Sequence, residues 1–105
     1  MSVFALGIWT VKEGREDDFV RAWLELGERV RRDVPERAAT LLRDRQQPNR
    51  FISFSRRDSL VHLEDGRNRL AQQATESDLR QWTGAMMELV ENLDRYTLDV
   101  VGEIE

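Results

Sequence analysis

The sequence predicts an α+β fold in which two helices pack on one four-stranded antiparallel sheet, in the order β-α-β-β-α-β. The first observation behind it is a central hairpin: residues 38–57 hold two apolar runs separated by the polar segment 45–50. Pro48 presets φ for a turn there, and Asn49 tolerates the left-handed region that can follow it. A segment with helical periodicity and one with strand periodicity lie on each side of the hairpin. This is the order of the compact ferredoxin-like arrangement of four strands and two helices.

The composition indicates a single domain covering residues 1–105. The chain is 40% hydrophobic and 34% charged, which suits one soluble core and leaves no room for a second. A net charge of −4 provides no general electrostatic attraction for nucleic acid or for an anionic membrane. We therefore expect neither as a partner.

Targeting and redox signals are also missing. No apolar run approaches the ~20 residues that span a bilayer, and the N-terminal segment has no basic start ahead of its apolar stretch. We therefore expect a cytoplasmic protein. Without cysteine, the chain has no disulfide, no thiol nucleophile and no Cys-ligated metal centre.

Residues 3–11 are predicted to form the first strand. Both of its faces are apolar, with Phe4, Leu6 and Ile8 on one and Val3, Ala5, Gly7 and Trp9 on the other. A small antiparallel sheet usually shows water one polar face, so we expect a second cover, most simply the sheet of another copy. Gly7 is either a tolerated weak point in the strand or a place where a ligand or backbone comes close.

The first helix is predicted to begin near Glu16 and to end before Val34 and Pro35. Acidic residues at 16–18 favour a first helical turn, arginines at 29, 31 and 32 favour the last, and the residue before proline is biased away from helix. The apolar stripe consists of Phe19, Val20, Trp23, Leu24, Gly27 and Val30.

In the second half, the hairpin's second strand alternates, with Ile52 and Phe54 on one face and Phe51, Ser53 and Ser55 on the other. The two serines are either pocket donors or solvated edge residues. A short helix is expected at 60–65, and residues 75–78 resemble a capping box. The second long helix then carries Leu79, Trp82, Met86, Leu89 and Leu93 on one face, and 94–104 is predicted to form the last strand.

Four short motifs are spread over nearly the whole chain: VKEGREDDF at residues 11–19, LRD at 42–44, PNRF at 48–51 and DS at 58–59. Their order and spacing resemble the antibiotic biosynthesis monooxygenase family of ferredoxin-like proteins. The resemblance implies a homodimer, a dimeric α/β barrel in which two sheets face each other. It also implies that any small-molecule cleft lies between the sheet and the helices of each subunit.

The haem-degrading branch of that family is a poor match. An Asn on the first strand, a Trp before the Asp-Ser pair and a His on the following helix do the work there. The matching positions here are Gly7, Arg57 and, by spacing, about Arg67. His62, the only histidine, falls about a turn early for an iron ligand, so we do not expect haem degradation.

No phosphate-binding glycine loop, G-x-S-x-G, two-histidine metal pair or dinucleotide fingerprint is present. We therefore expect no cofactor. In the monooxygenases that the chain resembles, a phenol or quinol substrate supplies the electrons to dioxygen itself. The protein then needs a dry pocket, a base or donor for the phenol, and aromatic walls.

The predicted function is oxidation of a small aromatic or polyketide-like substrate. His62 is the candidate catalytic base, because its unperturbed pKa lies near neutrality, although a solvated surface histidine is the competing interpretation. The candidate substrate-binding residues are Gly7, Trp9, Ser53, Ser55, Trp82 and Met86, with the two tryptophans as walls and Ser53 as a donor. The alternative function is a non-catalytic homodimer that binds a small apolar ligand or only assembles. A polar, ionisable group facing the cleft would favour the enzyme.

Overall fold

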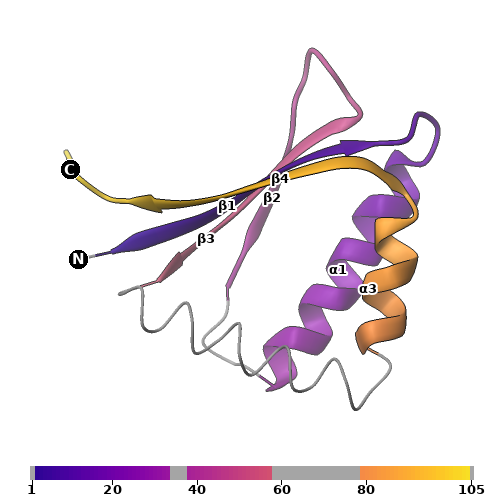
Figure 1. The fold of residues 1–105 in the computed structure, drawn as a ribbon, viewed down its shortest axis with the longest axis horizontal. Helices are drawn as coiled ribbons and strands as arrows, with labels where there is room; N and C mark the ends of the chain where they lie inside the picture. The colour runs from indigo at the N-terminus through magenta and orange to yellow at the C-terminus, as the bar shows by residue number, and fades with distance from the viewer. Residues whose placement is uncertain (1, 34–37, 58–78, 105) are drawn as a thin grey trace.

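The computed structural model describes residues 2–33, 38–57 and 79–104, which form one antiparallel sheet with two helices on the same side of it (Figure 1). The elements are β1 (Val3–Val11), α1 (Glu16–Asp33), β2 (Thr40–Arg43), β3 (Arg50–Arg57), α3 (Leu79–Met87) and β4 (Val90–Asp99). The strand order is β2-β3-β1-β4. The predicted α+β, ferredoxin-like fold is confirmed.

The central hairpin is present, but its turn differs in detail from the prediction. Asp44 organises it, since Oδ1 accepts hydrogen bonds from the backbone N–H groups of Gln46 (2.8 Å) and Gln47 (3.3 Å). Asn49 does not adopt the left-handed conformation, because Gly14, with φ of 84°, is the one described residue with positive φ. Asn49 instead ties the turn to β1: its Nδ2 donates to the Val11 carbonyl at 3.0 Å, and its own carbonyl accepts from the Val11 N–H at 2.8 Å.

Helix α1 begins where the acidic residues predicted it, but its buried stripe is narrower. Phe19 is fully buried, and Trp23 and Leu26 follow it at helical spacing against the core. Leu24, predicted to lie in the stripe, is 53% exposed, and Gly27 is exposed too. The reason is angular: at about 100° per residue, positions 19, 23 and 26 share one side of the helix, whereas Leu24 lies about 130° from the middle of that side and so faces away from the core.

The boundary between α3 and β4 was predicted wrongly. The helix ends at Met87, and β4 begins at Val90 and ends at Asp99, so Leu93 belongs to the strand rather than to the helix. The turn is closed by the Leu89 N–H, which donates to the Met86 carbonyl at 3.0 Å. Long-range pairing decides the boundary, since Leu93 pairs with Trp9 on β1. Leu89 and Leu93 continue the three- to four-residue spacing of the helix beyond Met87, so this spacing alone does not show where the helix ends and the strand begins.

Residues 100–104 form no strand, and the side chains of Val101 and Ile104 are 95% and 101% exposed. The expected short helix at 60–65 and the capping box at 75–78 lie outside the described residues. In the described part of the chain, neither helix has the length and apolar character that crossing a membrane requires.

The two faces of the sheet differ in their cover. On the face that carries the helices, Trp9, Val11 and Phe51 pack with Phe19, Met86 and Val90 in one buried cluster. On the opposite face, hereafter the open face, β1 places Phe4, Leu6 and Ile8, all only partly buried. Their partners in the register extend this apolar surface on three further strands: Leu42, Ile52, Phe54, Tyr96 and Leu98. Both faces of β1 are therefore apolar, as predicted, and the described residues cover only one of them well.

Candidate functional site

A hydrogen bond between two predicted site residues lies on the helix-bearing face. The indole Nε1–H of Trp9 on β1 donates to Oγ of Ser53 on β3 at 2.9 Å. The two strands are neighbours, with Ser53 opposite Gly7 and Trp9 two residues further along β1. The Ser53 hydroxyl oxygen therefore accepts a hydrogen bond from the indole N–H, and its own O–H can donate a second hydrogen bond elsewhere.

Gly7 makes this hydrogen bond possible. A Cβ atom at residue 7 would lie 3.0 Å from Oγ of Ser53, 3.0 Å from Nε1 of Trp9 and 3.5 Å from Cδ1 of Leu93. The first two distances are too short for any larger side chain to fit without movement. The groups that come close to Gly7 are therefore side chains, whereas one of the two interpretations expected a ligand or backbone there.

Aromatic rings surround the apolar side of this pair. The Trp9 ring lies 5.3 Å from that of Phe19, which in turn lies 5.1 Å from that of Phe51. Met86, from α3, is buried in the same cluster. Trp9 and Met86 thus belong to the packed core, and Trp9 is also the boundary between that core and Ser53.

Beyond Ser53 the helix-bearing face becomes polar. Ser55 is buried and pairs with Ala5, whereas the β4 residues across β1, Arg95 opposite Gly7 and Thr97 opposite Ala5, are exposed. Sequence reasoning missed Arg95 and Thr97. Because they are two residues apart on a strand, Arg95 and Thr97 are expected on the same face of the sheet. Only the register of β4 on β1 places them beside Gly7 and Ala5.

Two predicted site residues are not brought into this arrangement by the described structure. Trp82 lies in α3, where its backbone is described and its side chain is not. His62, the candidate base, lies outside the described residues. In the part of the chain that the structure describes, no group of His, Asp and Glu side chains could hold a metal ion.

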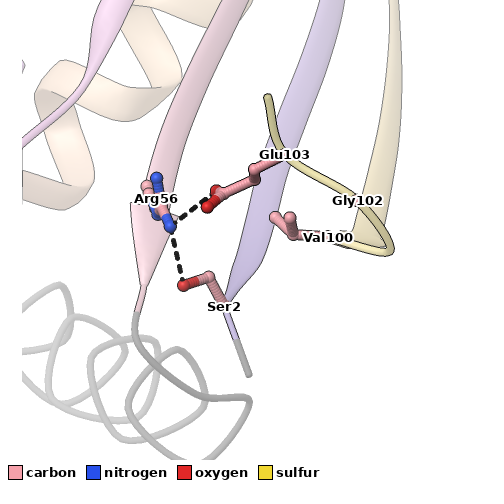
Figure 2. A pocket seen from close by; sticks show the side chains of 5 residues that line it. All are labelled: Ser2, Arg56, Val100, Gly102 and Glu103. Atoms are coloured by element: carbon pink, nitrogen blue, oxygen red, sulfur yellow. Dashed lines mark hydrogen bonds and ion pairs between the residues drawn. The ribbon is translucent and has the colours of Figure 1, made fainter. Parts of the chain in front are cut away.

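A separate depression of about 270 Å³ lies where the two chain ends meet (Figure 2). It is lined by Ser2, Arg56, Val100, Gly102 and Glu103. Nη2 of Arg56 contacts Oε1 of Glu103 at 2.8 Å and Oγ of Ser2 at 3.1 Å. These contacts neutralise the guanidinium and fasten residues 100–104 to β3, so the depression is a structural junction.

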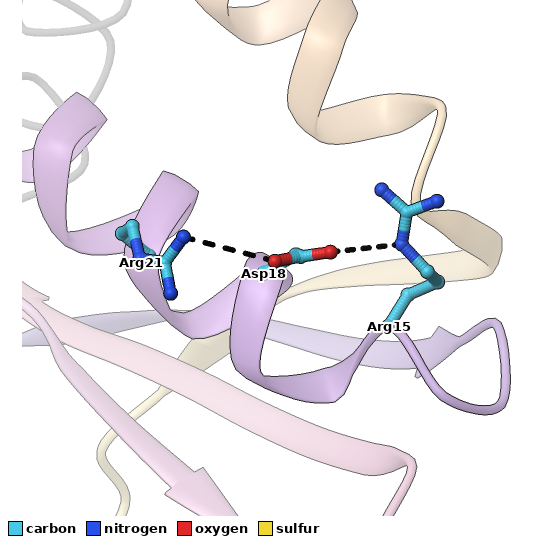
Figure 3. Close-up of polar contacts among 3 residues, drawn as sticks. All are labelled: Arg15, Asp18 and Arg21. Atoms are coloured by element: carbon cyan, nitrogen blue, oxygen red, sulfur yellow. Dashed lines mark hydrogen bonds and ion pairs between the residues drawn. The ribbon is translucent and has the colours of Figure 1, made fainter.

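The ion pairs at the start of α1 are structural as well. Oδ2 of Asp18 lies 2.9 Å from Nε of Arg15, and Oδ1 lies 3.8 Å from Nη1 of Arg21 (Figure 3). All three side chains are substantially exposed. Pairs of this kind contribute roughly 0–1 kcal/mol each, mostly to the helix start.

Solved structures share this arrangement of strands and helices. SnoaB from Streptomyces nogalater, a cofactor-independent oxygenase, superposes with a TM-score of 0.75 over 98% of this chain and 96% of its own, at 18% identity. A protein from Bordetella bronchiseptica assigned to the antibiotic biosynthesis monooxygenases gives 0.71 over 95% and 97%, also at 18% identity. The chain has the fold of the antibiotic biosynthesis monooxygenases.

The same fold occurs in another group. An uncharacterized NIPSNAP domain protein from Burkholderia xenovorans matches with a TM-score of 0.79 over 98% of both chains, at 12% identity. No model of a known protein family matches the sequence, and no curated protein is similar to it. At these identities the comparisons establish the fold alone.

Proposed function

We propose that this protein is a cofactor-independent monooxygenase that oxidises a small aromatic or polyketide-like phenol or quinol with dioxygen. One observation carries the proposal: the Trp9–Ser53 pair, framed by aromatic rings, on the face of the sheet that bears the helices. In this fold, that face adjoins the expected cleft. SnoaB, with the same fold, is a cofactor-independent oxygenase.

The chemistry asks little of the protein. When a ring CH₂ next to a phenol becomes a carbonyl, one atom of dioxygen enters the product. The other leaves as water with the two hydrogens of that carbon, so the substrate supplies all the electrons and no cofactor is needed. The protein must hold the substrate away from water and move its protons. In this proposal the Ser53 hydroxyl donates a hydrogen bond to a substrate oxygen, and Trp9 forms one wall of the substrate pocket. His62 is the proposed base.

The proposal includes a homodimer joined through the open faces. This face offers eight apolar side chains from all four strands, and Leu42, Tyr96 and Leu98 among them are exposed. A contiguous apolar patch on that scale marks an interaction site rather than ordinary surface. A second copy covers it with the same residues, which is the usual form of a two-fold interface.

The alternative function is a non-catalytic homodimer that binds a small apolar ligand or only assembles. Two observations favour it. The fold also occurs in a NIPSNAP domain protein that is uncharacterized, so the fold by itself does not imply oxygenase chemistry. Among the described residues, the group beside the Trp9–Ser53 pair is an arginine, Arg95, which does not act as a base at neutral pH.

Oxygen consumption with 1,8-dihydroxyanthrone, a phenol with an oxidisable CH₂, separates the two functions. The protein should accelerate uptake after treatment with a chelator, with one dioxygen consumed per carbonyl formed. His62→Ala should lower turnover by ~10²–10⁴-fold if His62 is the base. The matched control is Arg21→Gln on the exposed surface of α1, which should leave the rate unchanged. An uptake rate equal to that in buffer for this and related anthrones would favour the non-catalytic function.

A further inference from the structure

We infer that Arg95 on β4, together with Ser53 on β3, binds an acidic oxygen of the ligand and makes this site selective for anionic aromatic molecules. The inference builds on the proposed binding site and adds the charge class of its ligand. The oxygen can belong to a phenolate, an enolate or a carboxylate, because all three offer lone pairs to the same two donors.

The sheet register places the two donors on one line. Gly7 pairs with Ser53 on one side and with Arg95 on the other, so the three residues form a single row across β3, β1 and β4. Residues paired in this way share a face of the sheet, and here it is the helix-bearing face, as the Trp9–Ser53 hydrogen bond shows. Three neighbouring strands span about 10 Å, a distance that an arginine side chain and one ligand oxygen can bridge.

No side chain of this row stands between the donors, although Nε1 of Trp9 and Cδ1 of Leu93, from the next row, lie 3.0 Å and 3.5 Å from where a Cβ of Gly7 would be. Gly7 has no side chain, and it cannot gain one without displacing Oγ of Ser53 or Nε1 of Trp9. The Trp9 indole N–H donates to one lone pair of the Ser53 hydroxyl oxygen, so the hydroxyl proton of Ser53 can donate to another acceptor. A ligand oxygen between Ser53 and Arg95, on the side of Gly7 away from Trp9 and Leu93, can therefore receive a hydrogen bond from each of them.

The charge of Arg95 is not neutralised within the described structure. Arg15, Arg21, Arg43, Arg50 and Arg56 each have a carboxylate within 4.0 Å, whereas Arg95 forms no ion pair among the described residues. Its neighbour Asp94 lies on the open face, opposite Ile8. Asp99 shares its face but lies four residues along the strand, about 13 Å away.

Exposure differs among the three residues of this row and is greatest at Arg95. Ser53 is half-buried, Gly7 is buried and Arg95 is exposed. An aromatic body can thus lie toward Trp9, out of water, while its acidic oxygen lies near the cation at the edge of the sheet. An exposed arginine without an ion pair among the described residues is ordinary by itself, since Arg45 is another; Arg95 is distinguished by its row.

A pair of probes that differ in charge tests the inference. 2-Naphthoate and 2-naphthamide have nearly the same shape, and only the first is an anion. Calorimetric titrations at low salt should show that the native protein binds 2-naphthoate at least tenfold more tightly than 2-naphthamide. The reason is that hydrogen bonds to charged groups are about twice as strong as hydrogen bonds between neutral groups. Arg95→Gln should remove that preference, and Arg95→Lys should keep part of it.

The control is Arg21→Gln, which removes an exposed arginine on α1 and should leave the preference intact. Equal affinities for the two probes in the native protein would overturn the inference while leaving the proposed oxygenase untouched. A preference that survives Arg95→Gln would also overturn it, as would failure of both probes to bind. Failure of the oxygenase proposal appears separately, as absent oxygen uptake in a protein that still binds 2-naphthoate.

Discussion

Phe51 and Phe54 lie three residues apart on β3, and they belong to two different surfaces. Phe51 is 1% exposed beneath α1, with its ring 5.1 Å from that of Phe19. Phe54 lies on the open face, partly buried, and its nearest described ring is that of Phe4 at 6.1 Å. The same residue type thus stabilises the subunit on one face and is available for association on the other.

The two faces also differ along the strands. The open face is mainly apolar over successive rows of the register, from Phe4 to Ile8 on β1, with the charged residues Arg56 and Asp94 in its two end rows. The helix-bearing face changes from the aromatic cluster around Trp9 to Ser53, Ser55 and Thr97 within two rows. A mainly apolar surface suits a second copy, whereas a boundary between aromatic and polar groups suits a small ligand with one polar end.

The largest expected effect is on the helix-bearing face. Phe51→Ala should lower the free energy of unfolding by about 3–5 kcal/mol, because it leaves a cavity in a closely packed cluster. Urea denaturation measures this, and the loss should not depend on protein concentration. A loss under about 1 kcal/mol would mean that Phe51 is not part of the core that the fold needs.

The matched change on the open face should act on association. Phe54→Ala should raise the dimer dissociation constant by about 100-fold, because each of two symmetric copies loses about half of a phenylalanine's burial, roughly 2–3 kcal/mol per dimer. Sedimentation velocity over a range of concentrations measures it. If the native protein is monomeric at micromolar concentration, the open face is not a homodimer interface and the comparison between the faces fails.

The smallest expected effect lies at the boundary between core and polar residues. Ser53→Ala should cost about 1–3 kcal/mol of unfolding free energy, because the largely buried indole N–H of Trp9 loses its acceptor. Gly7→Ala should cost a similar ~1–3 kcal/mol through overpacking. The double variant should cost less than the sum of the two, since removing Oγ relieves one of the short contacts. Strict additivity would show that Gly7 and Ser53 are not coupled.

The sequence by itself determined the elements and the composition of their faces. The bounds of β1 follow from its apolar run, and the start of α1 follows from its acidic first turn, because neighbouring residues largely govern such local structure. Three of the predicted site residues, Gly7, Trp9 and Ser53, come from separate signals in the sequence, and they lie together in the structure. The alternation of side chains predicts that Gly7 and Trp9 share one face of the first strand and that Ser53 shares a face of its strand with Phe51.

Only the tertiary structure decided how those faces meet. Trp9 and Ser53 are 44 residues apart, and their hydrogen bond depends on which residue of β3 lies opposite Gly7. The place of Arg95 depends likewise on the register of β4, and the same pairing assigns Leu93 to the strand rather than to the helix. A shift of one residue in pairing would move every side chain to the other face, and the local pattern of an apolar strand does not fix that choice.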